Sequence, residues 1–342
     1  MGMADLGLCL GNRRDGLFDS VSGFSADLMK PVIHPSARAE ARRQAMVEDL
    51  TANRLPSAFL YESSAQSERW LAVHHAFSPF INDPSCRALY GWISSQAATH
   101  AREKKMPVVG LGCGSGIKDS MLLEQMDEPV YWPVDISLEL VLEAVANSPA
   151  LNNHPLVFDL ARSEEIGGFF DDQILSDSRR VFTLFGLLPN FSPQILSGLL
   201  RKVLSAGDLL LFSANLAPGN DYAKSVDLIM LQYDNPVTRE WLAGALAEIG
   251  VTPSGGRLFF GQQIVQGDLR RIEARWRFEK QHTVEFSGHH FAFESGDELE
   301  VFYSIRYTMP TVMEWLKLAG LSLLDHRQSG SGEEAVFFCQ AS

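Results

Sequence analysis

Glycines at alternating positions follow a short apolar run near residue 108. The segment 108–118 reads Val-Val-Gly-Leu-Gly-Cys-Gly-Ser-Gly-Ile-Lys, with glycine at Gly110, Gly112, Gly114 and Gly116. Glycine has no Cβ atom, so such a loop can turn tightly and let a ligand approach the backbone closely. A glycine loop by itself is a weak signal, and a purely structural tight turn is the alternative interpretation.

A second apolar run, residues 130–135, ends in the carboxylate of Asp135, 23 residues after Gly112. If both runs are parallel strands, the glycine loop and the carboxylate meet at the same edge of the sheet. A carboxylate there can accept hydrogen bonds from the ribose hydroxyls of an adenosine. The alternative is that Asp135 caps the helix that follows it.

The glycine spacing distinguishes between two adenosine cofactors. The dinucleotide fingerprint G-x-G-x-x-G fails, because its third glycine would be Ser115 counted from Gly110 and Ile117 counted from Gly112. A glycine at every second residue is instead common in methyltransferases that use S-adenosylmethionine (SAM). One feature departs from their pattern, since the acid expected two residues before Gly112 is Gly110 here. The loop therefore predicts a SAM site.

Polar residues also follow the third and fourth apolar runs. Asp159 ends the third run, where its carboxylate could accept from the adenine amine, although a loop cap explains it nearly as well. Asn190 lies in the segment 184–191 after the fourth run. Its amide can donate and accept, and so could hold a substrate amine or carboxylate, but an ordinary turn residue after proline is an equal alternative.

The residues described above lie in a part of the chain, from about 107 to 213, where strand and helix patterns alternate. Such alternation predicts a parallel sheet with helices on both faces and ligand loops at the carboxyl ends of the strands. Ser137 and Ser192 are plausible caps for two of the helices. We predict strands at 107–112, 130–135, 155–159, 180–185 and 207–213, and helices at 117–126, 138–147 and 193–204.

Residues 219–303 do not continue the alternation of strands and helices. Two helical stretches are followed by alternating segments rich in aromatic residues, which is typical of a half-buried antiparallel sheet. The chain then returns to a helix and two strands joined by a short loop, an antiparallel ending that separates a methyltransferase sheet from an all-parallel dinucleotide fold. We predict helices from after Asn220 through Leu231, at 237–249 and at 309–318, and strands at 257–260, 272–278, 282–286, 298–305, 321–325 and 335–339.

These patterns predict an α/β protein with a Rossmann-like class I SAM-methyltransferase sheet whose last strand is antiparallel. That domain would comprise residues 85–218 and 304–342. A second, α+β substrate-binding domain would comprise residues 1–84 together with the insertion 219–303.

Composition limits the classes of partner. The 342 residues carry a formal net charge of −13, which argues against a nucleic-acid partner, and the basic stretch 270–277 fits a solvated strand face. No apolar run has the length of a membrane span. The four cysteines lack the spacing of a disulfide framework or a zinc site, so no metal is expected. We expect a cytoplasmic protein that acts on a small molecule, with its oligomeric state left open.

Several motifs together resemble the histidine Nα-methyltransferase of ergothioneine biosynthesis and its fungal dimethylallyltryptophan N-methyltransferase relatives. The similar segments are Gly112 with Lys118, Pro133–Ser137, Pro189–Phe191, and Tyr233 with the two residues after it. The segment 55–62, which contains Tyr61, is similar to that family's N-terminal motif. The resemblance implies a cofactor site of Gly112, Gly114, Gly116, Lys118, Asp135, Ile136, Asp159 and Leu160.

The same resemblance implies that Asn190 and Tyr233 hold the backbone of an amino-acid substrate. Methyl transfer to an amine releases a proton, which solvent, Tyr61 or Tyr233 could take. SAM is the implied cofactor.

Departures from the family concern the substrate side chain. Phe302 stands where the family has a glutamate for the imidazole, while Ser304 is retained. Ala274 replaces a methionine, which predicts a roomier wall, and the N-terminal Tyr-Tyr-Pro element is changed at 77–79. Loss of the carboxylate favours a flat apolar group. We therefore expect an aromatic or hydrophobic amino acid or amine, not histidine.

Three other functions compete with this expectation. An O- or C-methyltransferase of another natural-product intermediate would need no free amine. A non-catalytic SAM-binding regulator would bind the cofactor without turnover, and a nicotinamide dehydrogenase would bind NAD instead.

Overall fold

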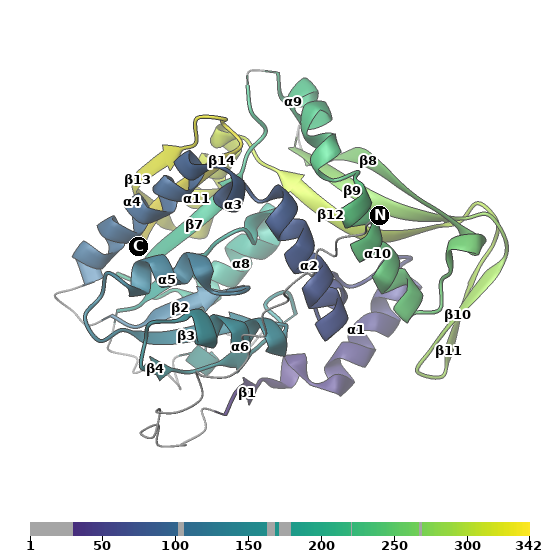
Figure 1. Ribbon diagram of the computed structural model, residues 1–342, viewed down its shortest axis with the longest axis horizontal. Coiled ribbons are helices and arrows are strands. Elements are labelled where there is room, and N and C mark those ends of the chain that lie inside the picture. Colours follow the sequence, from purple (N-terminus) through teal and green to yellow (C-terminus); the bar gives the residue numbers. More distant parts are fainter. Residues whose placement is uncertain (1–29, 102–105, 163–167, 171–178, 220, 267–268) are drawn as a thin grey trace, which may run out of the picture. The chain divides into compact units, whose positions relative to one another are not determined.

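A mixed sheet organises the chain, of which the structure, a computed structural model, describes residues 30–342 except 102–105, 163–167, 171–178, 220 and 267–268. Within these residues nine strands form one sheet in the order β1-β5-β3-β2-β6-β7-β14-β13, with β4 beside β3 (Figure 1). The strands are β1 (Val32–Ile33), β2 (Val108–Leu111), β3 (Val130–Asp135), β4 (Asn152–Asn153), β5 (Leu156–Val157), β6 (Val181–Leu184), β7 (Leu209–Asn215), β13 (Leu321–Gln328) and β14 (Glu334–Ala341).

The directions of the strands confirm the predicted class of sheet. All neighbouring pairs from β1 to β7 are parallel, whereas β14 runs antiparallel to both β7 and β13. The chain leaves β2 toward β3 on one side and returns on its other side as β6, so the strand order reverses at β2. A crevice opens at the carboxyl ends of the strands at such a switch point, and the glycine loop follows β2 there.

Each face of this sheet has its own hydrophobic core. Val108 and Val109 are adjacent in β2 and belong to different clusters, as the alternation of side chains in a strand requires. One cluster includes α4 and α5, and the other includes α8 and α11. Ser137 and Ser192 cap their helices as predicted, each accepting from a main-chain N–H three residues on. The helices are α4 (Pro84–Ala101), α5 (Ile117–Leu123), α6 (Leu138–Asn147), α8 (Pro193–Val203) and α11 (Met309–Ala319).

A second sheet, β12-β9-β8, lies in the predicted insertion, beside the hairpin β10-β11 (Figure 1). The strands are β8 (Gly256–Gln266), β9 (Leu269–Phe278), β10 (His282–Phe286), β11 (His289–Phe293) and β12 (Glu298–Arg306). The sequence pattern did not predict β11. The sequence feature that could have indicated this strand is the Ser287-Gly288 pair before it. These two residues have positive φ angles of 51° and 82° and form the two-residue turn of the hairpin.

Helices from two distant parts of the chain pack on this second sheet. Met46 and Leu60, from the N-terminal part, share one hydrophobic cluster with Trp241 and Trp276 of the insertion. Residues Pro31–Ser342 form one compact unit, and the division into two domains stays a prediction. The helices here are α1 (Ala39–Thr51), α2 (Ser64–Phe77), α9 (Tyr222–Ile229) and α10 (Pro236–Glu248). The short α3 (Pro79–Asn82) instead packs beside α4 in a cluster of the main sheet. Short 3-10 turns are η1 (Pro35–Ala37), η2 (Ser57–Leu60), η4 (Leu188–Asn190), η5 (Met230–Gln232) and η6 (Pro253–Gly255).

Three of the arginines of β9, Arg271, Arg275 and Arg277, form ion pairs with glutamates of the same sheet. Arg271 and Arg275 both form ion pairs with Glu273 and Glu300, as expected for a solvated strand face. No helix in the described ranges is long and apolar enough to cross a membrane.

Candidate functional site

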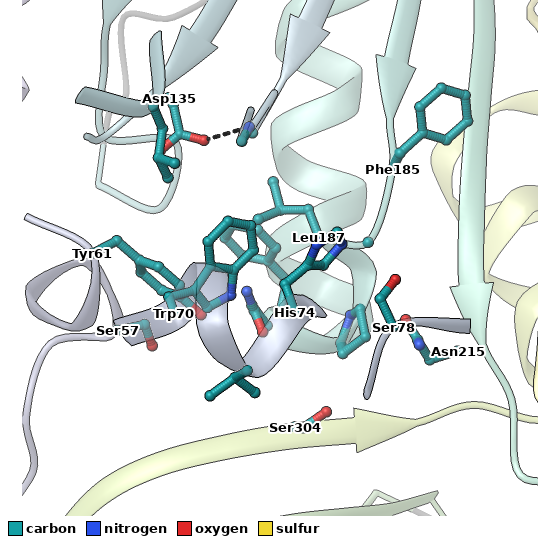
Figure 2. Close-up of a pocket in the computed structure, with 18 of the residues that line it drawn as sticks. Ser57, Tyr61, Trp70, His74, Ser78, Asp135, Phe185, Leu187, Asn215 and Ser304 are labelled. Atoms are coloured by element: carbon teal, nitrogen blue, oxygen red, sulfur yellow. Dashed lines mark hydrogen bonds between the residues drawn. The ribbon is translucent and has the colours of Figure 1, made fainter. Parts of the chain in front are cut away.

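A cavity of about 370 Å³ lies at the carboxyl ends of β2, β3 and β6. Its walls come from the glycine loop, the loop after β6, helices α2 and α10, and strand β12. In Figure 2, Asp135 and Ser304 enter from opposite sides, with Trp70 and His74 of α2 between them. The sheet edge predicted to hold a cofactor and the strand predicted to read a substrate therefore open into one cavity.

The glycine loop approaches its neighbours too closely for side chains. Gly112 has φ of +63°, and a Cβ atom there would lie 2.6 Å from Leu187, on the loop after β6. Gly112 and Gly114 both line the cavity. Gly116 does not, because it precedes α5 and lies against α6, where a Cβ atom would be 2.8 Å from Ala144. The structure thus gives Gly116 a packing role and does not bring it to the cavity.

Asp135 anchors the glycine loop and still faces the cavity. Its Oδ2 accepts from the Gly114 main-chain N–H at 3.1 Å (dashed in Figure 2), and its Oδ1 accepts from that of Ser137 at 3.1 Å. Burial raises the pKa of Asp135, while these N–H donors oppose the rise. A carboxylate has about four acceptor positions, so Asp135 can also accept from ribose hydroxyls.

The acid missing from position 110 has a counterpart on α5. The carboxylate of Asp119 accepts from the Tyr131 hydroxyl at 2.6 Å and from the Thr183 hydroxyl at 2.7 Å. Burial raises the pKa of Asp119 to about 6. Its side chain lies beside Gly110, the position at which the methyltransferase pattern predicts an acid, but Asp119 does not line the cavity.

The expected adenine end of the cavity is lined by Phe158, Asp159 and Leu160, with Ile136. Asp159 Oδ1 accepts from the main-chain N–H of Ala161 at 2.9 Å, so the residue does cap its own loop. Its second oxygen leaves an acceptor for an adenine amine, and both interpretations of Asp159 fit the structure.

Two opposite charges line the cavity beside Tyr90. The Lys118 ammonium lies 4.8 Å from the centre of the Tyr90 ring and forms no salt bridge with the residues that the structure describes. Glu334 is buried and accepts from the Tyr90 hydroxyl. A lysine and a glutamate suit the carboxylate and ammonium of the methionine part of SAM. The sequence predicted Lys118 and missed Glu334, which opens the last strand.

Tyr61, Asn190, Tyr233, Phe302 and Ser304 all line the cavity, as predicted for the substrate side. Burial, and then the charge of Asp135, raise the pKa of Tyr61 far above its usual value, while a hydrogen bond from the Asn190 side chain opposes the rise. Tyr61 therefore stays protonated at neutral pH. Its hydroxyl can hydrogen-bond a substrate, and a role for Tyr61 as the base stays a prediction.

Aromatic rings surround Phe302. Its ring centre lies 5.7 Å from that of Trp241 and 6.1 Å from that of Tyr233, and Trp241 lies 5.6 Å from Tyr61. The Ser304 hydroxyl is the polar exception, 2.9 Å from the Tyr233 hydroxyl. This aromatic wall (Phe302, Trp241, Tyr233 and Tyr61) suits a flat or apolar group.

Ala274 does not line the cavity. It is fully buried and is the cross-strand partner of Phe302 in the β9–β12 pairing. Ala274 belongs to the hydrophobic cluster against which Phe302 packs. The roomier wall predicted at this position is therefore not part of the cavity.

Several cavity residues had not been predicted. Trp70 stacks on His74 along α2, with ring centres 5.3 Å apart. Burial, and then the charge of Lys118, lower the pKa of His74 to about 3, so its imidazole is neutral. Among the described residues, the buried Thr238 hydroxyl has no hydrogen-bond partner. Arg306, on β12, also lines the cavity.

Two sequence signals could have found some of these residues. Trp70 and His74 are four residues apart, the spacing of one helix face. Phe302, Ser304 and Arg306 follow the period of a strand. In the described ranges no three His, Cys, Asp or Glu side chains lie together as a metal site would require.

A sequence profile of the family described as histidine-specific, SAM-dependent methyltransferases matches residues 91–341. No curated protein sequence matches the chain.

Solved structures of methyltransferases show a distant likeness. A SAM-dependent methyltransferase from Clostridium acetobutylicum is 15% identical, with 80% of this chain and 99% of that one covered and a TM-score of 0.41. For magnesium protoporphyrin IX methyltransferase from Synechocystis the identity is 12%, the coverage 82% and 97%, and the TM-score 0.43. For a sugar N-methyltransferase from Streptoalloteichus the identity is 13%, the coverage is 78% of this chain and 92% of that one, and the TM-score is 0.41.

Proposed function

The chain belongs to the histidine-specific, SAM-dependent methyltransferase family, and we propose that it methylates the amine nitrogen of a small amino acid or amino-acid-derived molecule. The enzyme class and the cofactor follow from the family itself. The substrate is our proposal, and it is an aromatic or hydrophobic compound that is not histidine.

The residues at the sheet edge fit the cofactor. Asp135 offers carboxylate oxygens to a ribose, and Lys118 and Glu334 offer opposite charges to an amino-acid end. When bound, SAM supplies an electrophilic methyl group on a positively charged sulfur. In the transfer an N–C bond forms, the S–C bond breaks, and S-adenosylhomocysteine leaves with the bonding electron pair.

The chain's own task is to position a neutral amine and to exclude water. Asn190 and the protonated Tyr61 both line the cavity and can together hold an amine. A buried tyrosine that keeps its own proton is a poor base. We therefore assign the proton released from the amine to solvent, and to Tyr61 only the role of a hydrogen-bond partner.

The substrate class rests on one observation, the place of Phe302 in the aromatic wall. An imidazole would lose the charged partner that the family's glutamate provides, and it would be enclosed by rings instead. An indole, a phenyl ring or a branched aliphatic group would gain burial and ring contacts there.

Mass spectrometry of products from a mixture of amino acids and aromatic amines with SAM tests the proposal. We expect N-methylated products from aromatic or apolar acceptors and none from histidine. Phe302→Glu should lower turnover of these acceptors, whereas Phe302→Leu, which keeps the wall apolar, should retain them. Asn190→Ala should weaken acceptor binding while S-adenosylhomocysteine still binds. Products methylated only at oxygen or carbon, or acceptor binding unchanged in both Phe302→Glu and Asn190→Ala, would refute the assignment.

A further inference from the structure

A buried arginine shares a face of β12 with the two residues predicted to read the substrate. Arg306 follows Phe302 and Ser304 at intervals of two, so the alternation of a strand brings all three to one side. All three line the cavity. Arg306 is only 4% exposed.

Neutral groups surround its guanidinium. Nε donates to the Tyr233 hydroxyl at 2.9 Å, Nη2 donates to Gln232 Oε1 at 3.2 Å, and Nη1 donates to the Leu216 carbonyl at 3.4 Å. The guanidinium also lies 5.2 Å from the centre of the Tyr233 ring. Five N–H groups are present and three are used, which leaves two donors.

No carboxylate of the described residues forms a salt bridge with Arg306. Gln232, which accepts from Arg306, donates its amide N–H to Glu333 at 2.8 Å. A buried charge normally has a charged partner, because removing it from water is costly. A cation that opens into a ligand cavity with two spare donors is suited to an anion supplied by the ligand.

We propose that Arg306 binds the carboxylate of the methyl acceptor. The substrate is then an amino acid that keeps its carboxylate, and the corresponding decarboxylated amine is a poor acceptor. This inference rests on the proposed function and narrows it.

Tyr233 would act together with the arginine. Its hydroxyl oxygen accepts from Arg306 Nε, so its own hydrogen is free for Ser304 or for the same carboxylate. The carboxylate would lie at the C-terminal end of β12, beside Arg306. The acceptor's side chain would point toward Phe302, which precedes Ser304 by two residues.

Calorimetry in the presence of S-adenosylhomocysteine tests this with ligand pairs that differ only in the carboxylate. The pairs are L-tryptophan with tryptamine and L-phenylalanine with phenethylamine. We expect wild-type protein to bind each acid roughly 30- to 100-fold more tightly than its amine, as a charge-assisted, two-point contact allows. Arg306→Gln should reduce this preference to about threefold or less by weakening the acid alone, and Arg306→Lys should keep part of it.

Arg277→Gln is the matched control, because Arg277 lies on β9, pairs with Glu298 and does not line the cavity. It should leave the preference unchanged. Affinity for S-adenosylhomocysteine reports that each variant is folded.

Equal binding of acid and amine by the wild-type protein would overturn the inference, whatever the variants do. So would an undiminished preference in Arg306→Gln. If amines are methylated and their acids are not, the proposed function stands and this inference fails. If neither class binds or reacts, both fail.

Discussion

A Cβ atom on Gly110 would lie 2.3 Å from Oδ2 of Asp119. The carboxylate on α5 thus occupies the space in which a side chain of β2 would otherwise project. β2 carries glycine at the position where the methyltransferase pattern predicts an acid, and α5 places a carboxylate beside that position. The position of the Asp119 carboxylate therefore depends on the absence of a side chain at Gly110.

Gly110→Ala should destabilise the fold by about 1–3 kcal/mol, because the new methyl group overlaps both Asp119 and the Tyr131 hydroxyl. Chemical denaturation measures the change. Gly198→Ala on α8 is the control, since a Cβ atom there meets no atom within 4 Å. We expect Gly198→Ala to be neutral or to stabilise the protein by up to about 1 kcal/mol. Equal effects of the two substitutions would show that position 110 has spare room.

The stability contributed by Asp119 should depend on pH. Burial raises its pKa from 3.8 to about 6, so the folded protein holds this proton more tightly than the unfolded chain. The contribution is complete below pH 4 and is lost as the pH rises through about 6. Relative to Asp119→Asn, the wild-type free energy of unfolding should fall by about 2 kcal/mol between pH 4 and pH 7. Denaturation at several pH values measures this, and a constant difference between the two proteins would contradict it.

Asp135→Asn should weaken binding of S-adenosylhomocysteine by roughly 10- to 100-fold, because an amide is a poorer acceptor for ribose hydroxyls than a carboxylate. Calorimetry gives the affinity. Asp325→Asn, on the exposed part of β13, changes the same charge away from the cavity and should have no effect. Unchanged affinity in Asp135→Asn would leave Asp135 with the helix-cap role alone.

Tyr303→Phe removes the hydroxyl that donates to the Asn190 carbonyl at 2.8 Å and keeps the ring. We expect stability to fall by about 1 kcal/mol and the acceptor's KM to rise, because the loop that carries Asn190 loses a tether. Affinity for S-adenosylhomocysteine should stay the same. Steady-state kinetics with a methylated acceptor measure the effect, and a change confined to cofactor affinity would contradict it.

Most of the central sheet could be predicted from the apolar runs and from the turn and loop residues that separate them. The strands that were missed there, β1 and β4, are two residues long and too short to show a period. The antiparallel ending followed from the short loop before β14, and the helix caps at Ser137 and Ser192 followed from residue type.

The cavity could be predicted only in part. Asp135 and Asn190 end strands or follow them, so the topology of the sheet brings them to one edge. Trp70 and His74 belong to a helix far away in the sequence, and helical spacing cannot say which cavity its face will cover. Ala274 shows the opposite failure. Its small side chain predicts space in the cavity, but Phe302 is its cross-strand partner and packs against the same hydrophobic cluster.

Strand β12 assigns two tasks to alternate residues. Phe302, Ser304 and Arg306 share one face of the strand and line the cavity. The hydroxyls of Tyr303, which also lines the cavity, and of Tyr307, which follows the strand, donate to the carbonyls of Asn190 and Phe191. If Phe302, Ser304 and Arg306 bind the acceptor as we propose, substitutions at these three positions would change which acceptor fits. The two tyrosine hydroxyls would still hold the loop that carries Asn190 in place.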